Sequence, residues 1–191
     1  MSILERLGLG AHPGRAADTL DTDGETFAHY SATSRQNGKV DQPDGQPTKL
    51  RNVLVAIHGD EMDDELVKLG CMMARAKKGR VFGVYGVEVP RTLPVDATLP
   101  EVTEKAGEAL EHAVALAEGA NSEIEPEIVQ SRNYGHSLVD EAEAHQCGLI
   151  ILGIPYRTDR SGRFDPGETV PYVLTHAKCR VWVIRGQQRG S

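Results

Sequence analysis

Two glycine-bearing segments that lie far apart in this 191-residue sequence have the composition of an anion-binding loop. His58 and Gly59 follow a short apolar run, and a second loop runs from Gly153 to Gly167 ahead of a helical segment. Glycine allows a phosphate group to approach the backbone, and unbonded N–H groups at a helix start attract negative charge. The second loop also carries guanidinium groups that can pair with phosphate, at Arg157, Arg160 and Arg163. If the two segments converge, these residue types predict binding of a nucleotide or a similar anion.

Acidic side chains beside the first glycine segment offer a rival chemistry. A receiver-like phosphoacceptor needs carboxylates clustered at the end of a strand, and four follow the apolar run at Asp60, Glu61, Asp63 and Asp64. The run itself ends in His58, however, and carboxylates in the first turn of a helix are explained by the helix dipole. The anion-binding interpretation is therefore preferred.

Motifs of enzymatic chemistry are missing from the sequence. It contains no Gly-x-Ser-x-Gly, no lysine-bearing P-loop and no His-Glu-x-x-His. Carboxylates that recur at helical spacing are typical of a solvated face rather than a metal site, and they stand at Glu101, Glu104, Glu108 and Glu111. His136-Ser137 indicates a helix start with Ser137 or a neighbour as N-cap. We therefore expect a protein that is not an enzyme and has no metal site, with slow ATP hydrolysis as an open alternative.

Short β-rich runs alternate with segments of helical periodicity after residue 50. The runs predict strands at 53–57, 80–89, 124–130, 149–152 and 180–184, and helices at 62–78, 101–119, 137–146 and 168–176. This alternation is typical of an α/β fold with three layers, in which helices cover both faces of a doubly wound parallel sheet. Ligands of such sheets bind beyond the carboxyl ends of the strands where the winding reverses. The loops after Ile57 and Leu152 should therefore form the site.

The composition places further bounds on the protein. Residues 1–49 are poor in Leu, Ile and Val and predict a flexible arm or linker, residues 50–186 a domain, and residues 187–191 a disordered tail. A net charge of −7 makes nucleic acid a poor partner. No apolar stretch is long enough to span a membrane, and the cysteines, at Cys71, Cys147 and Cys179, are expected to be reduced core residues. We expect a cytoplasmic location.

The order of these features resembles the universal stress protein signature. Strand, Gly153, loop, Gly167 and helix are followed by His176-Ala177-Lys178-Cys179-Arg180-Val181, and the resemblance covers about Lys49 to Arg185. It implies a Rossmann-like five-stranded sheet with strand order 3-2-1-4-5 and a regulatory module for stress response that binds ATP or AMP. It also implies a homodimer through the last strand, with Trp182 buried there or in the core. Residues 167–174 look similar to the variant found as a cytoplasmic extension of amino-acid permeases, which suggests a membrane transporter as partner.

The sequence departs from the family's nucleotide-binding pattern at several positions. ATP-binding members resemble one another in a Gly, two residues, Gly, nine residues, Gly-Ser/Thr pattern. Here Tyr156 stands in place of the second glycine, ten residues precede Gly167, and Glu168 takes the hydroxyl position with Thr169 beside it. His58 replaces the usual aspartate. Gly86 replaces an aliphatic residue, so the pocket is either wider there or filled by a neighbour.

The candidate cofactor-binding residues follow from both lines of reasoning. They are Ala56, Ile57, His58, Gly59, Gly86, Leu152, Gly153, Arg157, Gly167, Glu168 and Thr169. The preferred hypothesis is a nucleotide-binding or anion-binding regulatory module. The alternatives are a homodimeric interaction scaffold that binds no nucleotide and a slow ATPase.

Overall fold

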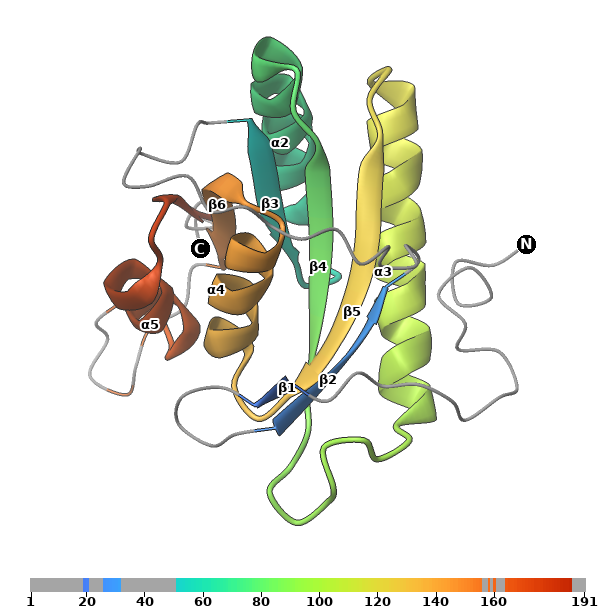
Figure 1. Cartoon of the computed structure of the whole chain (residues 1–191), viewed down its shortest axis with the longest axis vertical. Helices are drawn as coiled ribbons and strands as arrows, with labels where there is room; N and C mark the ends of the chain where they lie inside the picture. The colour runs from blue at the N-terminus through green and yellow to red at the C-terminus, as the bar shows by residue number, and fades with distance from the viewer. Residues whose placement is uncertain are drawn as a thin grey trace.

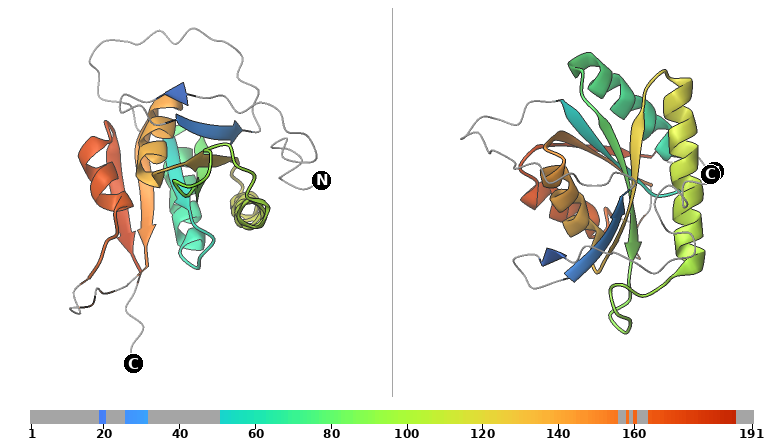
Figure 2. Two further views of the ribbon diagram at one scale, coloured as in Figure 1. Left: turned by 90° about the horizontal axis from the view of Figure 1, so that it is seen from below. Right: turned by 45° about the vertical axis from the view of Figure 1, so that its right-hand side comes forward.

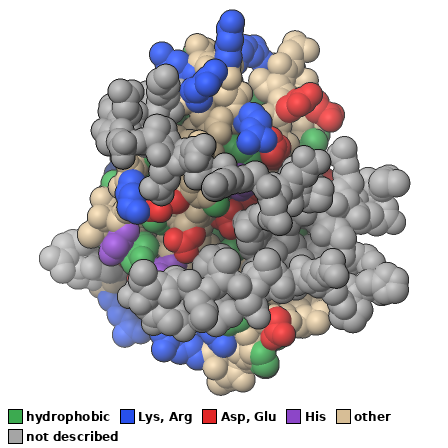
Figure 3. Space-filling model, viewed as in Figure 1, with side chains coloured by type: hydrophobic (Ala, Val, Ile, Leu, Met, Phe, Trp, Pro, Cys, Tyr) green, Lys and Arg blue, Asp and Glu red, His purple; other side chains and the backbone are tan. Residues whose placement is uncertain are grey.

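The computed structural model describes residues 19–20, 26–31, 51–155, 158, 160 and 164–186, which are coloured in Figure 1 and Figure 3. The elements in chain order are β1 (Thr19–Leu20), β2 (Thr26–Ser31), β3 (Asn52–Ile57), α2 (Asp63–Lys77), β4 (Val81–Glu88), α3 (Pro100–Gly119), β5 (Ile124–Ser131), α4 (Tyr134–Ala144), β6 (Cys147–Ile154), α5 (Thr169–His176) and β7 (Arg180–Arg185). Each predicted strand and helix after residue 50 is present. None of the helices in the described part of the chain combines the length and the apolar composition of a membrane span.

The five predicted strands form one parallel sheet. They lie in the order β5-β4-β3-β6-β7, which is the predicted 3-2-1-4-5, and each neighbouring pair is parallel. The fold prediction is therefore confirmed, and the winding direction reverses between β3 and β6 (Figure 1). Because β3 lies between β4 and β6 in the sheet, its carboxyl end lies beside the loops that follow these two strands.

The sheet contains two more strands than predicted, and both are antiparallel to their neighbours. β2 pairs with the outer edge of β5, with Ala28 opposite Gln130 and Ser31 opposite Glu127, and β1 pairs with β2. These strands lie inside the segment predicted as an arm, whereas the other residues before 51 lie outside the described part of the chain. An edge strand offers a row of backbone donors and acceptors, so a short pairing segment needs little apolar composition to join it. The scarcity of Leu, Ile and Val therefore does not reveal these strands.

The core is divided by the sheet into two layers. Val53, Val55 and Ile57 of β3 pack with α2 and α3, whereas Leu54 and Ala56 pack on the opposite face with α4 and α5. All five side chains are buried. The two helix pairs thus cover opposite faces of the sheet (Figure 2). A strand buried on both faces is uniformly apolar, which is why the run was recognisable in the sequence.

Helix α4 begins three residues earlier than predicted. Its N-cap is Asn133, whose Oδ1 accepts a hydrogen bond from the His136 N–H at 3.3 Å, and the prediction that Ser137 or an adjacent residue caps the helix is wrong. Asn is among the strongest N-cap residues. Gly135 packs closely against α5, because an added Cβ would lie 3.1 Å from the Tyr172 ring.

Other expectations are resolved by burial. The glutamates of α3, from Glu101 to Glu111, are exposed as predicted for a solvated face. The three cysteines are free thiols, with Cys71 and Cys147 buried and Cys179 half-buried. Trp182 is 38% exposed on the edge strand β7, so it does not lie in the core of the domain.

Candidate functional site

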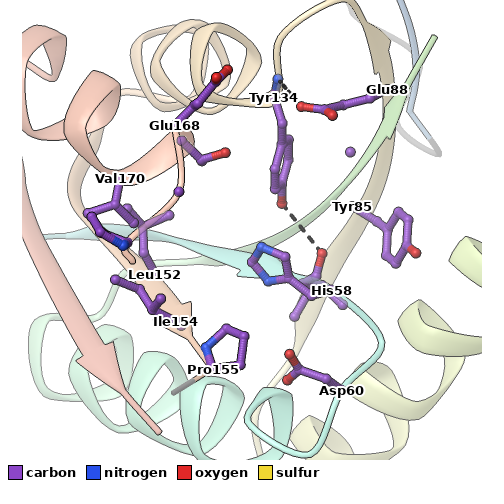
Figure 4. A pocket seen from close by; sticks show the side chains of 16 residues that line it. His58, Asp60, Tyr85, Glu88, Tyr134, Leu152, Ile154, Pro155, Glu168 and Val170 are labelled. Carbon is purple, nitrogen blue, oxygen red and sulfur yellow. Dashed lines mark hydrogen bonds between the residues drawn. The ribbon is translucent and has the colours of Figure 1, made fainter. Parts of the chain in front are cut away.

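A pocket of about 370 Å³ lies where the chain reverses its winding direction (Figure 4). The carboxyl ends of β3, β4 and β6 form its floor, and the segment before α5 forms one wall. Its described lining consists of Ile57, His58, Asp60, Tyr85, Gly86, Glu88, Tyr134, Leu152, Gly153, Ile154, Pro155, Pro166, Gly167, Glu168, Thr169 and Val170. The two glycine-bearing segments identified in the sequence therefore do converge on one cavity.

Most of the candidate residues line this pocket. Eight line the pocket, namely Ile57, His58, Gly86, Leu152, Gly153, Gly167, Glu168 and Thr169. Ala56 does not, because its side chain is buried in the core on the α4 side of the sheet. Gly59 lies next to the pocket in the loop after β3 but does not line it. Arg157 lies outside the described residues.

The loop after β3 is held by Asp63 at the start of α2. Its carboxylate accepts hydrogen bonds from the N–H groups of Gly59 at 2.7 Å and His58 at 3.2 Å. Gly59 has φ of +79°, which glycine adopts without strain. Burial raises the pKa of the Asp63 carboxyl, and the two backbone donors oppose that rise. These two N–H groups are therefore not free to bind an anion, whereas the His58 side chain lines the pocket.

The acidic residues of the rival phosphoacceptor interpretation do not converge. Asp63 faces the loop backbone, and Asp64 lies 2.7 Å from His112 Nε2 and 3.9 Å from Lys68 Nζ. Asp60 lines the pocket, and its Oδ1 accepts from the Met62 N–H. The structure therefore gives these three carboxylates separate roles in the turn and in α2.

The Tyr134 ring occupies the space above Gly86. Its hydroxyl donates to the Val84 carbonyl at 2.7 Å, and the Ile57 carbonyl lies 3.4 Å from the same oxygen. An ideal Cβ on Gly86 would lie only 2.1 Å from the ring. Of the two possibilities that Gly86 raised, the pocket is thus filled by a neighbour and not widened. Burial raises the pKa of Tyr134 well above its usual value, so the hydroxyl stays a donor.

His58 stands at the centre of the pocket with Tyr134 beside it. Figure 4 shows the tyrosine ring pointing from the start of α4 toward the imidazole. The two rings meet edge to face, with centroids 5.6 Å apart. The face of the His58 ring can therefore stack against a planar ligand, with the apolar residues Leu152, Ile154 and Pro155 forming the opposite side.

The wall before α5 contains the second glycine. Gly167 has φ of +71°, and its N–H donates to Asp165 Oδ1 at 2.9 Å. That amide is therefore used by the chain's own carboxylate, whereas the N–H groups of Thr169 and Val170 have no partner within the helix. Glu168 is exposed, and Figure 4 shows its carboxylate pointing away from His58. Glu168 thus does not plug the pocket.

The described lining is acidic. Asp60, Glu88 and Glu168 contribute carboxylates, and no Lys or Arg is among the described residues of the wall. Glu88 also accepts a hydrogen bond from the Tyr134 N–H at 3.2 Å, which fixes the start of α4. Carboxylates near a ligand disfavour additional negative charge. The geometry suits a planar, weakly charged group near His58, with a phosphate at the first turn of α5.

Sequence reasoning missed part of the lining. The candidate cofactor-binding residues did not include Asp60, Tyr85, Glu88, Tyr134, Ile154, Pro155, Pro166 and Val170. Ile154 and Pro155 follow Gly153 directly, so extending the loop by two residues finds them. Glu88 is the residue two positions after Gly86 on the same face of β4. Tyr134 gives no such signal, because it comes from a helix on another part of the chain.

Comparisons with known proteins place the chain among related folds. A family model described as the universal stress protein family matches residues 49–185. A universal stress protein from Archaeoglobus fulgidus is 21% identical, with a TM-score of 0.60, covering 70% of this chain and 97% of its own. A structure of the Archaeoglobus fulgidus universal stress protein in complex with dAMP is 20% identical, with a TM-score of 0.57 and coverages of 70% and 96%. A universal stress protein in complex with cAMP is 18% identical, with a TM-score of 0.51 and coverages of 71% and 97%. No curated protein sequence matches the chain.

Proposed function

The chain belongs to the universal stress protein family, and we propose that it is a regulatory module that binds an adenine nucleotide between β3 and β6. One observation carries the proposal. The residues after β3 and the two glycines that flank the β6–α5 loop line a single pocket at the point where the winding of the sheet reverses. That point is where open α/β sheets bind their ligands.

The chemistry of the lining supports a specific orientation. The base would stack on the His58 ring against the apolar side of the pocket, and the phosphate would accept from the N–H groups of Thr169 and Val170. The structures with dAMP and cAMP in similar folds support the class of ligand.

The charge of the lining favours few phosphates. A triphosphate would bring three or four negative charges close to Asp60, Glu88 and Glu168, whereas AMP brings two and cAMP one. We therefore expect AMP and cAMP to bind more tightly than ATP in the absence of a divalent cation, and added Mg²⁺ to narrow the difference.

Isothermal titration of the full chain with AMP, cAMP and ATP tests this proposal. Gly167→Val should abolish binding, because valine is strained at φ of +71° and the first turn of α5 would move. Gly119→Val is a matched control, since a Cβ there meets nothing within 4 Å. Absence of heat at millimolar nucleotide would remove the proposal, and unchanged affinity in Gly167→Val would place the ligand elsewhere.

Further measurements on the same sample distinguish the alternative functions. If the chain forms a dimer but binds no nucleotide, the interaction scaffold becomes the better description. If nucleotide binds, phosphate release distinguishes a sensor from a slow ATPase. Regulation of a membrane transporter stays a hypothesis supported by the likeness of residues 167–174 to permease extensions.

A further inference from the structure

A second group of chemically active side chains lies at the other end of α4 from the pocket. Glu127 of β5, Glu141 of α4 and His145, the C-cap of α4, direct their side chains to one point. His145 Nε2 lies 2.9 Å from Glu127 Oε1, 3.0 Å from Glu127 Oε2 and 3.3 Å from Glu141 Oε2. The candidate pocket involves Tyr134 at the first residue of this 11-residue helix. The two groups are therefore roughly 15 Å apart along α4.

The three side chains are a ligand set for a divalent transition metal. Imidazole nitrogen and carboxylate oxygen are common zinc ligands, and tetrahedral zinc at about 2.0–2.1 Å from each donor separates the donors by about 3.3 Å. The observed separations of 2.9 and 3.3 Å between His145 Nε2 and the two glutamates need adjustments of a few tenths of an ångström. Glu141 and His145 stand at i and i+4, the spacing that puts two ligands on one face of a helix.

Burial distinguishes this group from an ordinary surface cluster. Glu127 is 1% exposed and Glu141 is 2% exposed, and glutamates are rarely buried to this extent without a cationic partner or a metal. The His145 side chain is 19% exposed, so one side of the cluster is open to solvent. That opening gives a metal ion a way in and leaves room for water as a fourth ligand, as in open zinc sites.

Neighbouring groups fix the imidazole in the orientation that a ligand needs. The Phe82 ring stacks on the His145 ring, with centroids 3.9 Å apart and an angle of 18° between the planes. Asn52 Nδ2 donates to the His145 carbonyl at 2.8 Å and ties the end of α4 to β3. Metal sites depend on such supporting contacts, because they remove the freedom that binding would otherwise have to restrict.

We propose that Glu127, Glu141 and His145 bind one divalent transition metal ion, with zinc as the best fit to the ligand types and the four-coordinate geometry. The site would tie β5 to α4 and stabilise the face of the sheet that these elements share. The proposal does not depend on nucleotide binding.

Two other arrangements compete with this one. The first is a metal-free ion pair in which a protonated His145 serves both carboxylates. The second is metal binding through thiolates, since Cys147 and Cys179 are free thiols in the core layer that α4 covers. A cobalt probe separates all three, because tetrahedral Co²⁺ has strong visible absorption and Co²⁺–thiolate bonds add a distinct near-ultraviolet band.

The test uses the full chain without an affinity tag, treated with EDTA and titrated with Co²⁺ and then with Zn²⁺. We expect one Co²⁺ per chain with tetrahedral visible absorption, no thiolate band, and displacement by Zn²⁺. His145→Gln and Glu141→Gln should each weaken binding at least about 100-fold, as loss of a direct ligand requires. The matched controls are His112→Gln, which alters an exposed histidine of α3, and Glu143→Gln, which alters an exposed glutamate of α4.

Each result bears on the proposal. If the wild-type chain binds no Co²⁺ or Zn²⁺, the ion-pair arrangement is correct and the proposal fails. A thiolate band, or binding that is unchanged in His145→Gln, would move the metal to another set of ligands and equally overturn it. Since a variant can lose its fold, circular dichroism is recorded for each, and Zn²⁺-dependent thermal stabilisation of the wild-type chain gives a second readout.

Discussion

Substituting Gly86 by alanine should disrupt the arrangement of Tyr134 that shapes the pocket. An ideal Cβ at position 86 would lie 2.1, 2.4 and 2.6 Å from the Cδ2, Cε2 and Cγ atoms of the tyrosine ring. These separations are well inside van der Waals contact, and three atoms of one rigid ring are involved. A small shift cannot relieve the contact, so the ring has to leave its position.

The cost can be worked out from the contacts that the ring would lose. The Tyr134 hydroxyl donates to Val84 O at 2.7 Å, and leaving this buried carbonyl without its donor costs about 1–3 kcal/mol. Repacking an overfilled site costs about 1–3 kcal/mol more. Replacing a strand glycine by alanine returns about 0.5–1 kcal/mol through backbone entropy. Gly86→Ala should therefore lower the free energy of unfolding by about 1–5.5 kcal/mol.

A double-mutant cycle measures this coupling. Tyr134→Ala alone should cost about 3–5 kcal/mol, as for other buried aromatic residues. In the double variant the new methyl group enters space that the ring has vacated, so the total should be close to that of Tyr134→Ala alone. The assay is urea unfolding followed by far-ultraviolet circular dichroism. Gly119→Ala is the control, because a Cβ there meets nothing within 4 Å.

Additive costs in that cycle would contradict the reasoning. They would mean that Gly86 and Tyr134 do not compete for the same space, and the pocket floor would then need another explanation. A Gly86→Ala variant with unchanged stability would lead to the same conclusion, since the Tyr134 ring could then take another position without lowering the free energy of unfolding.

Two further predictions concern other parts of the domain. Asp63→Ala should lower the free energy of unfolding by about 1–3 kcal/mol, because the N–H groups of His58 and Gly59 lose their acceptor. The control Asp60→Ala should change it by less than about 0.5 kcal/mol. Equal effects of the two substitutions in urea unfolding would contradict the role given to Asp63. Trp182→Glu should convert the predicted β7-mediated dimer to a monomer of unchanged fold, because this side chain is 38% exposed on an edge strand. Light scattering measures the molar mass of both chains, and a monomeric wild-type chain would refute the dimer.

Much of the fold could be predicted because its signals are local. The run at 53–57 is apolar at every position, and a central parallel strand buried on both faces requires this composition. The edge strand β2 carries no such requirement, since backbone pairing with β5 suffices to position it. The start of α4 was misplaced because Ser137 was taken as the N-cap, whereas Asn133 caps the helix three residues before His136.

The cluster of Glu127, Glu141 and His145 was likewise not predictable from a local pattern in the sequence. The spacing of Glu141 and His145 is visible in the sequence, yet glutamates at helical spacing usually face solvent, as those of α3 do. What separates the two cases is Glu127, which the β5 register turns toward α4 rather than toward α3. That orientation follows from strand alternation only once the neighbours Ile128 and Val129 have been assigned to their opposite core layers.

Gly86 is the strongest case in which a residue's role depends on a distant partner. In the sequence it stands where an aliphatic side chain is usual, and both a wider pocket and a filled one were consistent with that. The deciding fact is that Tyr134 is the first residue of α4 and that its N–H donates to Glu88, 46 residues earlier in the chain. Once α4 is fixed there, the tyrosine ring reaches β4, and only glycine leaves room for it. The glycine therefore does not enlarge the site for a ligand, and the ring that it admits contributes a wall that no local pattern predicts.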